Sequence, residues 1–147
     1  MTKVIWHGGK KPDYGHYDPM VSNTMIGLLG IEMIEIGDDF LRMRMPVDER
    51  TKQPAGILHG GASVALAETV GSMAAGRCVD LTEVTVVGAE INANHLRPAT
   101  SGWVYGTARP ISLGSKLQVW SIEIADEEGK LVCISRFTAA VIPLPAK

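Results

Sequence analysis

Apolar and polar residues alternate along much of the chain, and this alternation predicts strands. In residues 40–47 Leu41, Met43 and Met45 alternate with Arg42 and Arg44, and a Gly-Asp-Asp turn at residues 37–39 separates this run from the run IEMIEI. Period-two alternation around such a turn is typical of a β-hairpin with one face in the core. Further strands are expected at residues 84–96, 103–111, 117–125 and 131–142, with a turn at 126–130.

Residues 60–76 have a different pattern, because Glu68 is their only charged residue and apolar side chains fall on nearly every side of a helix. Such a helix is expected to be buried all round, wrapped by sheet. A shorter helix is expected at residues 24–29. Runs of strands around one long central helix predict an α+β fold with a single antiparallel sheet. Residues 1–20 are expected to form an irregular N-terminal arm, and residues 21–147 one domain.

Composition excludes several classes of function. The 147 residues include 14 basic and 16 acidic side chains, so the net charge of -2 indicates neither nucleic-acid binding nor a polybasic membrane surface. No apolar run is long enough to span a membrane. Cys78 and Cys133 lack a metal-binding spacing and are expected to be small buried hydrophobes. Without the apolar core of a secretory signal, the chain is expected to be cytoplasmic.

Glu68 is the strongest single candidate for chemistry. An unpaired carboxylate in an apolar helix costs several kcal/mol when it is desolvated, so it must be neutralised, hydrogen-bonded or placed at an opening. Ser72 lies one turn further on, at i+4, where its hydroxyl can reach the carboxylate. Desolvation raises the pKa of a carboxyl group, which suits a general base near neutral pH. The alternative is that Glu68 merely faces a hydrated gap in the sheet.

The sequence His59-Gly60-Gly61 stands where the long helix begins. The free N–H groups of a first helical turn can hold a carbonyl oxygen or an oxyanion, although the same residues also fit a simple turn before a helix. Glu68 lies roughly 11 Å further along the same helix, at 1.5 Å per residue. One helix therefore cannot supply both groups to one carbonyl, and two antiparallel helices of a two-fold dimer are expected to share the site.

Three other segments are candidates for binding. Gln53 lies in the loop before the helix, where its amide faces either a substrate or solvent. Strand parity places His95 and Arg97 on the core face of their strand, together with Val87, Ala89, Ile91 and Ala93. The turn at residues 112–116, with Arg109 nearby, fits a phosphate site or an ordinary hairpin turn.

Three runs in this order, GILHGGASVALAETVGSMAA, VVGAEINANHLRP and ISLGSKLQVW, closely resemble the hotdog-fold acyl-CoA thioesterases of the phenylacetate-degradation type. The resemblance covers residues 24–142. It implies a hotdog fold, in which a six-stranded antiparallel sheet curls around the long helix. It also implies dimers with a continuous sheet, usually paired into tetramers, and neither metal nor cofactor, with CoA entering only as part of the substrate.

The resemblance also implies roles for individual residues. Glu68 matches the nucleophile or general base, and the N–H of Gly60 or Gly61 matches the group that polarises the thioester carbonyl. Gln53 and His59 match residues that line this carbonyl and its leaving thiol, and Ser72 matches a residue that positions the attacking water. Positions matching contacts to the acyl group, pantetheine and nucleotide are Gly88, His95, Leu96, Arg97, Pro98, Ser112, Leu113, Gly114, Ser115, Lys116 and Leu117. Relatives often carry arginine in place of Lys116.

These observations favour hydrolysis of an aromatic or mixed acyl-CoA to free acid and CoA, with Glu68 acting from the partner protomer. Direct attack by the carboxylate and general-base activation of water both remain open. One alternative is a hotdog hydratase or dehydratase with His59 as its base. The other is a non-catalytic protein that binds acyl-CoA at the start of the helix.

Overall fold

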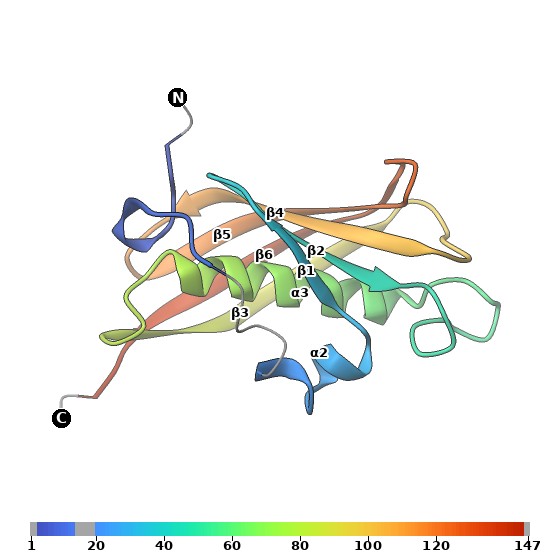
Figure 1. Cartoon of the computed structure of the whole chain (residues 1–147), viewed down its shortest axis with the longest axis horizontal. Helices are drawn as coiled ribbons and strands as arrows, with labels where there is room; N and C mark the ends of the chain where they lie inside the picture. The colour runs from blue at the N-terminus through green and yellow to red at the C-terminus, as the bar shows by residue number, and fades with distance from the viewer. Residues whose placement is uncertain (1–2, 14–19, 146–147) are drawn as a thin grey trace.

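The computed structural model describes residues 3–13 and 20–145 of the chain. Within these residues one long helix lies against a six-stranded antiparallel sheet (Figure 1). The helical segments are η1 (His7–Gly9), α2 (Met25–Leu28) and α3 (Gly60–Arg77), and the strands are β1 (Glu32–Ile36), β2 (Leu41–Pro46), β3 (Val84–His95), β4 (Trp103–Leu113), β5 (Leu117–Ala125) and β6 (Leu131–Pro143). The expected α+β hotdog fold is confirmed.

The sheet has the strand order β1-β2-β4-β5-β6-β3, so that β1 and β3 form its two edges. In β2, Leu41, Met43 and Met45 are fully buried, whereas Arg42 and Arg44 between them remain partly exposed. This is the alternation that the sequence predicts for a strand with one face in the core. The apolar face of the sheet packs against α3, which contacts β2, β3, β4, β5 and β6.

The helix α3 is buried along one side only. Its buried residues recur every three to four positions: Ala62, Ser63, Leu66, Ala67, Val70, Gly71, Ala74 and Ala75. The opposite side, which includes Val64, Ala65, Glu68 and Met73, is half-buried. The expectation that the sheet of one chain buries this helix all round is therefore wrong. Apolar side chains on the uncovered side need a further neighbour if they are to leave water.

A β-bulge in β3 changes which residues face the core. The pairing of β3 with β6 shifts between Gly88 and Glu90, so one extra residue enters β3 at this point. Val87 is consequently 43% exposed, although strand parity placed it in the core, whereas Ile91 and Ala93 do pack against the core. The extra residue reverses the alternation, and no feature of the hydrophobic pattern reveals it.

The N-terminal segment contributes to the core of the domain. Trp6 is only 3% exposed, and its indole Nε1 donates a hydrogen bond of 2.7 Å to the carbonyl oxygen of Gly37. The neighbouring Ile5 N–H donates to the carbonyl oxygen of Asp38 at 3.0 Å. Residues 3–13 are thus docked on the β1–β2 turn, with the single short turn η1, near the C-terminal end of α3 (Figure 1). Residues 14–19 of the expected arm lie outside the described residues.

Trp6 is expected to be a major source of stability. Replacing Trp6 with alanine removes a large buried ring, and such substitutions cost about 3–5 kcal/mol of unfolding free energy. Trp6→Phe keeps most of the buried area but loses the bond to Gly37, for an expected loss of about 1–2 kcal/mol. Urea unfolding at one fixed protein concentration measures both variants. A loss below 1 kcal/mol for Trp6→Ala contradicts a docked N-terminal segment.

Both cysteines are free thiols. Cys133 is buried in the core, as the sequence predicted, whereas Cys78 at the end of α3 is half-buried. Burial raises the pKa of the Cys78 thiol to about 12 and also raises the pKa of Cys133. Both side chains are therefore protonated near neutral pH, and they behave as small apolar groups.

Candidate active site

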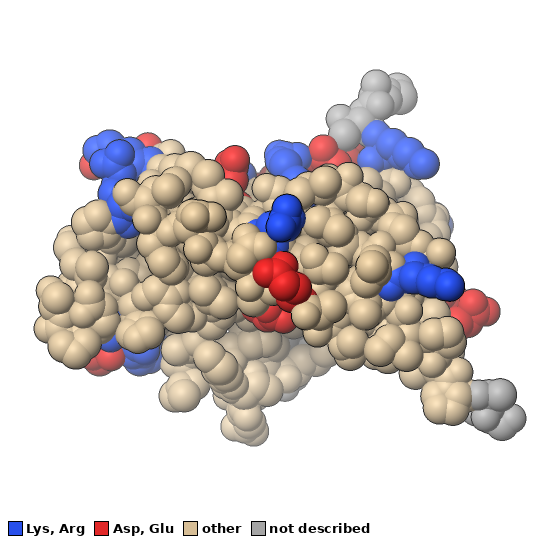
Figure 2. Space-filling model, turned by 180° about the vertical axis from the view of Figure 1, so that it is seen from behind, with Lys and Arg blue, Asp and Glu red and all other residues tan. Residues whose placement is uncertain are grey.

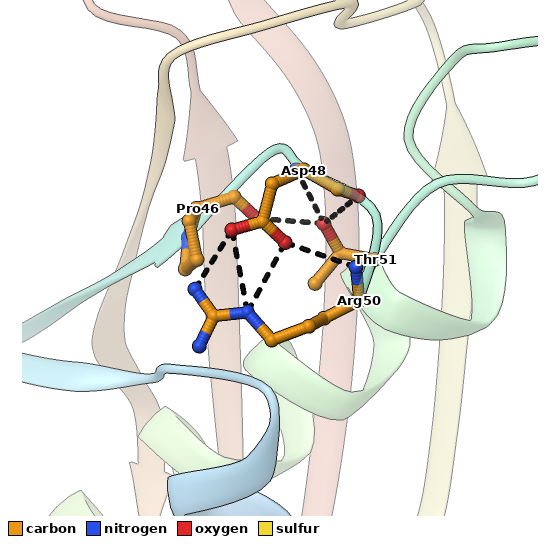
Figure 3. Close-up of polar contacts among 4 residues, drawn as sticks. All are labelled: Pro46, Asp48, Arg50 and Thr51. Atoms are coloured by element: carbon orange, nitrogen blue, oxygen red, sulfur yellow. Dashed lines mark hydrogen bonds and ion pairs between the residues drawn. The ribbon is translucent and has the colours of Figure 1, made fainter.

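The loop between β2 and α3 is held by a cluster of four residues, Pro46, Asp48, Arg50 and Thr51 (Figure 3). The buried Thr51 hydroxyl donates to the Pro46 carbonyl oxygen at 2.7 Å, and Arg50 Nη2 donates to Asp48 Oδ2 at 2.7 Å. Hydrogen bonds from the Arg50 side chain hold the pKa of Asp48 below its ordinary value. The Thr51 carbonyl oxygen then accepts from the His59 N–H at 2.8 Å. The cluster thereby fixes the point at which α3 begins.

Gln53 is oriented by its own loop. Its side-chain Oε1 accepts a hydrogen bond from the Ala55 N–H at 2.7 Å, and its backbone N–H donates to the Ile57 carbonyl oxygen at 2.9 Å. Because the side-chain oxygen is engaged in this way, the Nε2 group is the part of the amide that remains available as a donor. Gln53 also lines a pocket beside the start of α3.

The first turn of α3 exposes one backbone donor. His59 is the N-cap, and its Nδ1 accepts a hydrogen bond from the Gly61 N–H at 2.8 Å. The Gly60 N–H has no acceptor among the described residues. Of the two amides that the sequence singled out, Gly61 is therefore occupied and Gly60 is open. The N-terminus of an 18-residue helix adds a positive partial charge at this donor.

A pocket of about 380 Å³ opens at this point, and we name it the helix-start pocket. It is lined by Gln53, Gly60, Ser63 and residues 95–98, among others. His95 packs closely on Gly60, because a Cβ on Gly60 would come within 2.9 Å of His95 Nε2. The structure thus brings together Gln53, Gly60 and the segment His95-Leu96-Arg97-Pro98, which are distant in the sequence.

Ser63 is a polar residue of this pocket that the sequence analysis missed. It is only 2% exposed, although it lines the helix-start pocket. Ser63 follows Gly60 by three residues, so both lie on one side of α3. This spacing is the only sequence signal by which Ser63 could have been predicted as a site residue. A serine among alanines and glycines gives no other indication of a role.

Glu68 lies in a second pocket, of about 330 Å³, which we name the helix-flank pocket. The other walls are mostly apolar and come from α2, from the residue that follows it and from α3: Met25, Ile26, Leu29, Val64 and Ala65. Burial raises the pKa of Glu68 above the ordinary value, as the sequence predicted. No described residue forms a hydrogen bond or an ion pair with its carboxylate.

Gly88 lies against this carboxylate. A Cβ on Gly88 would overlap Glu68 Oε1 and would approach the Phe137 ring at 3.3 Å. The absence of a side chain at Gly88 therefore makes room for the Glu68 carboxyl group between α3 and β3. Gly88 was expected to contact the substrate, and within this chain it contacts Glu68.

Ser72 does not hold the Glu68 carboxylate in this chain. The two residues are one helical turn apart, but no hydrogen bond joins them among the described contacts. Ser72 is half-buried on the uncovered side of α3. Its expected role in positioning water stays a prediction.

Gly60 and Glu68 lie too far apart to act on one carbonyl within a single chain. Eight residues of α-helix correspond to a rise of about 12 Å, whereas groups acting on the same carbonyl must lie within about 3 Å of it. The two residues also line different pockets. A site that uses both groups therefore requires two chains.

The turn between β4 and β5 lies away from both pockets. Its residues Ser112, Leu113, Gly114, Ser115, Lys116 and Leu117 are all exposed, and none lines either pocket. Figure 1 places this turn near the C-terminal end of α3, opposite the helix start. Arg109 on β4 forms an ion pair with Asp39 at 2.9 Å, whereas Lys116 in the turn forms no ion pair with a carboxylate of the described residues.

In residues 3–13 and 20–145 no three His, Cys, Asp or Glu side chains lie close enough together to hold a metal ion. None of the helices formed by residues 3–13 and 20–145 is long and apolar enough to cross a membrane.

Residues 55–133 match the family model of the thioesterase superfamily. The sequence is 55% identical over 139 residues to the 1,4-dihydroxy-2-naphthoyl-CoA hydrolase of Escherichia coli, covering 95% of this chain and 100% of that protein. It is 50% identical over 119 residues to the proofreading thioesterase EntH of Cronobacter turicensis, covering 81% of this chain and 86% of that one.

The fold also matches those of solved structures. A crystal structure of a thioesterase from Haemophilus influenzae superposes with a TM-score of 0.90 at 49% identity, covering 97% of each chain. A mutant thioesterase from Pseudomonas aeruginosa superposes with a TM-score of 0.92 at 46% identity, covering 95% of this chain and 99% of that one.

Proposed function

The chain belongs to the thioesterase superfamily, and from this premise we propose that it hydrolyses acyl-CoA thioesters to a free acid and CoA. The observation that carries the proposal is that the half-buried Glu68 carboxylate has no partner among the described residues and that the Gly60 N–H is open. The first is suited to supply or activate a nucleophile, and the second to hold the carbonyl that is attacked.

In this mechanism the substrate carbonyl oxygen binds in the helix-start pocket. The Gly60 N–H donates to that oxygen, and the positive end of the α3 dipole stabilises the negative charge that develops as the carbon is attacked. The Nε2 group of Gln53 lies in the same pocket as a further donor. His59 supports this arrangement by capping the helix through the Gly61 N–H.

Glu68 of the partner protomer supplies the second half of the reaction. Its carboxylate either removes a proton from water, which attacks the carbonyl carbon, or attacks directly to give a mixed anhydride that water then hydrolyses. In both routes the carbon–sulfur bond breaks, and the CoA thiolate leaves and takes up a proton. Ser72 is proposed to position the water. Neither route requires a metal or a cofactor.

A two-fold dimer supplies the geometry that one chain lacks. The edge strand β3 presents 12 residues with one side unpaired, and Val87 is exposed on it. Pairing β3 with its copy continues the sheet and brings the uncovered sides of two α3 helices together in antiparallel orientation. The start of one helix then faces Glu68 of the other. We propose that this dimer is the active unit.

A second interface would join two such dimers. Uncharged residues cover most of the face turned away from the viewer in Figure 1, and charged side chains are scattered on it (Figure 2). Exposed apolar side chains also recur on β4, β5 and β6: Ile111, Leu113, Leu117, Ile134 and Ile142. Contiguous exposed apolar surface marks contacts between proteins, and we propose that these side chains form such a contact. It supports a dimer of dimers.

The acyl group and the CoA moiety are assigned to different surfaces. The apolar walls of the helix-flank pocket suit an aromatic or mixed acyl group, in keeping with the similarity to a naphthoyl-CoA hydrolase. The exposed turn Ser112–Leu117, with Lys116, is proposed to contact the CoA phosphates of a site that uses the partner chain. A lysine attracts phosphate as a point charge, without the bidentate geometry of arginine. A cytoplasmic location stays a prediction.

A thiol-release assay over aromatic and aliphatic acyl-CoA thioesters tests the proposal. We expect release of CoA with the highest kcat/KM for aromatic acyl groups. Incubation with enoyl-CoA covers the hydratase alternative, in which hydration occurs without release of thiol. Tight CoA binding without turnover of any thioester would instead support a non-catalytic binding protein.

The pH dependence of hydrolysis is expected to report the environment of Glu68. The reactive form is the carboxylate, so activity falls as the pH falls through the pKa of Glu68. Because burial raises this pKa, the acid limb of kcat/KM should have its midpoint above the pKa of an ordinary glutamate. The same shift means that the ionised carboxylate costs stability once the pH exceeds the ordinary glutamate pKa. Initial rates across the acid range measure the limb, and a midpoint at the ordinary value contradicts the expectation.

A further inference from the structure

Ser63 does not follow the usual behaviour of a hydroxyl within a helix. Serine and threonine hydroxyls inside helices commonly donate to the carbonyl oxygen four residues earlier. Thr69 in the same helix does so, with its hydroxyl 2.6 Å from the Ala65 carbonyl oxygen. Ser63 makes no such bond to His59, whose carbonyl oxygen accepts instead from the backbone N–H groups of Ala62 and Ser63.

The Ser63 hydroxyl is both buried and without a partner in the described part of the chain. The residue is 98% buried, and a hydroxyl that is removed from water without a hydrogen bond costs roughly 1–3 kcal/mol. Every fully enclosed side-chain oxygen or nitrogen of the described residues does have a partner. The Ser63 oxygen must therefore keep its small accessible area, and Ser63 lines the helix-start pocket. A group bound in that pocket would supply the partner that this hydroxyl lacks.

The pocket around Ser63 is rich in donors. The Gly60 N–H is open, and the Gln53 side chain keeps its Nε2 group free because its oxygen is bonded to Ala55. Side chains of a helix tilt toward its N-terminus, so the Ser63 hydroxyl lies over the turn that carries the Gly60 N–H. Donors that converge from a loop, a helix backbone and a helix side chain suit a ligand atom that accepts several hydrogen bonds.

We propose that the Ser63 hydroxyl donates a hydrogen bond to the thioester carbonyl oxygen, beside the Gly60 N–H. This inference rests on the proposed thioesterase function and adds a second donor from the same helix. The hydrogen bond strengthens as the carbonyl carbon is attacked and negative charge develops on its oxygen. Ser63 is thus expected to act mainly on the transition state, so that its loss lowers kcat more than it raises KM.

The first test compares two serine-to-alanine variants. In Ser63→Ala we expect kcat to fall about 10- to 100-fold. In other enzymes the loss of one hydrogen-bond donor to an oxyanion lowers kcat about 10²- to 10³-fold, so the expected effect lies at or below the lower end of that range. Ser135→Ala is the matched control, because Ser135 is equally buried but contacts Cys133 inside the core. We expect the control to keep its kcat. Ser63→Cys, which retains a weaker donor of similar size, should fall between Ser63→Ala and the unmodified protein.

The second test measures binding without turnover. Two CoA analogues carry the same acyl chain, one with a ketone that keeps the carbonyl oxygen and one a thioether that lacks it. Ser63→Ala should weaken binding of the ketone about 2- to 10-fold, less than the loss in kcat, and leave binding of the thioether unchanged. Thermal unfolding of each variant shows whether it is folded, and Ser63→Cys replaces Ser63→Ala if the latter is not.

The outcomes distinguish the role of Ser63 from the proposed thioesterase function. If the unmodified protein hydrolyses thioesters but Ser63→Ala matches Ser135→Ala in kcat and binds both analogues normally, the role of Ser63 is wrong and the proposed function stands. Equal weakening of both analogues also overturns the role, since it points to a general effect on the pocket. If the unmodified protein releases no thiol from any thioester, both proposals fall.

Discussion

We expect Glu68→Gln to lose about 10³-fold in kcat while keeping its fold and oligomeric state. General-base catalysis contributes about 10²- to 10⁴-fold, and Glu68 is the only ionisable residue lining the helix-flank pocket described here. Glutamine preserves the size of the side chain next to Gly88 but neither attacks the carbonyl carbon nor accepts a proton from water.

Although kcat falls, the stability of Glu68→Gln should stay equal to that of the unmodified protein or rise. Burial raises the pKa of Glu68, so its ionised form opposes folding near neutral pH, and the uncharged amide removes this cost. We therefore expect a melting temperature equal to or above that of the unmodified protein. Glu123→Gln on β5 is the matched control, because it removes an exposed carboxylate that is distant from both pockets in the described chain. A kcat within threefold of the unmodified protein excludes Glu68 from the reaction.

The second large effect is expected from Gly60→Pro, which removes the open N–H from the start of α3. We expect kcat about 10²- to 10³-fold below that of Gly60→Ala, the range for losing a backbone or side-chain donor to an oxyanion. Alanine carries the matching Cβ and keeps the N–H. Both variants place a Cβ 2.9 Å from His95 Nε2, so the displacement of this ring is common to both, and proline differs by carrying its Cδ in place of the amide hydrogen.

Proline is compatible with the backbone at this position. Gly60 is the first residue of the helix, where the N–H has no helical partner and proline is favoured. His59 before it has φ -69° and ψ 131°, the extended conformation that a residue preceding proline prefers. Circular dichroism should therefore show an unchanged fold. Equal kcat values for the two variants contradict a role for the amide.

Mixing the two defective variants tests whether the site is shared between chains. In a heterodimer of Glu68→Gln and Gly60→Pro, one site combines the intact Gly60 of one chain with the intact Glu68 of the other. Random reassortment of equal amounts makes about half of the dimers mixed, with one good site in two, so about a quarter of full activity should return. No recovery after verified subunit exchange means that Gly60 of one chain and Glu68 of the other do not form one site, and it contradicts the dimeric site.

The hydrophobic pattern of the sequence was sufficient to predict most of the fold. The strands β1 and β2, the helix α3 and the turn at Gly129 all lie within a few residues of their expected places. The reason is that side-chain alternation in strands and the preference of glycine for positive φ are local properties, and each leaves a trace in the sequence. The β-bulge after Gly88 left no such trace, so the prediction that Val87 faces the core was wrong.

The candidate site was predicted in part. Glu68 stands out because a single carboxylate interrupts an apolar helix, and its raised pKa follows from burial alone. The sequence could not distinguish Gly60 from Gly61, since that depends on the His59 side chain folding back to cap Gly61. It also missed Ser63, whose importance rests on what surrounds the hydroxyl and not on its residue type.

The sequence by itself determined the strands and the two α-helices, including the apolar central helix and the lone acidic residue on it. Tertiary structure alone decided that one sheet covers one side of α3, that Gly88 makes room for Glu68, and that Gln53, Ser63 and His95 meet at the start of the helix. Periodicity is a property of neighbours along the chain, whereas a pocket is made by residues that only the packing of sheet on helix brings together.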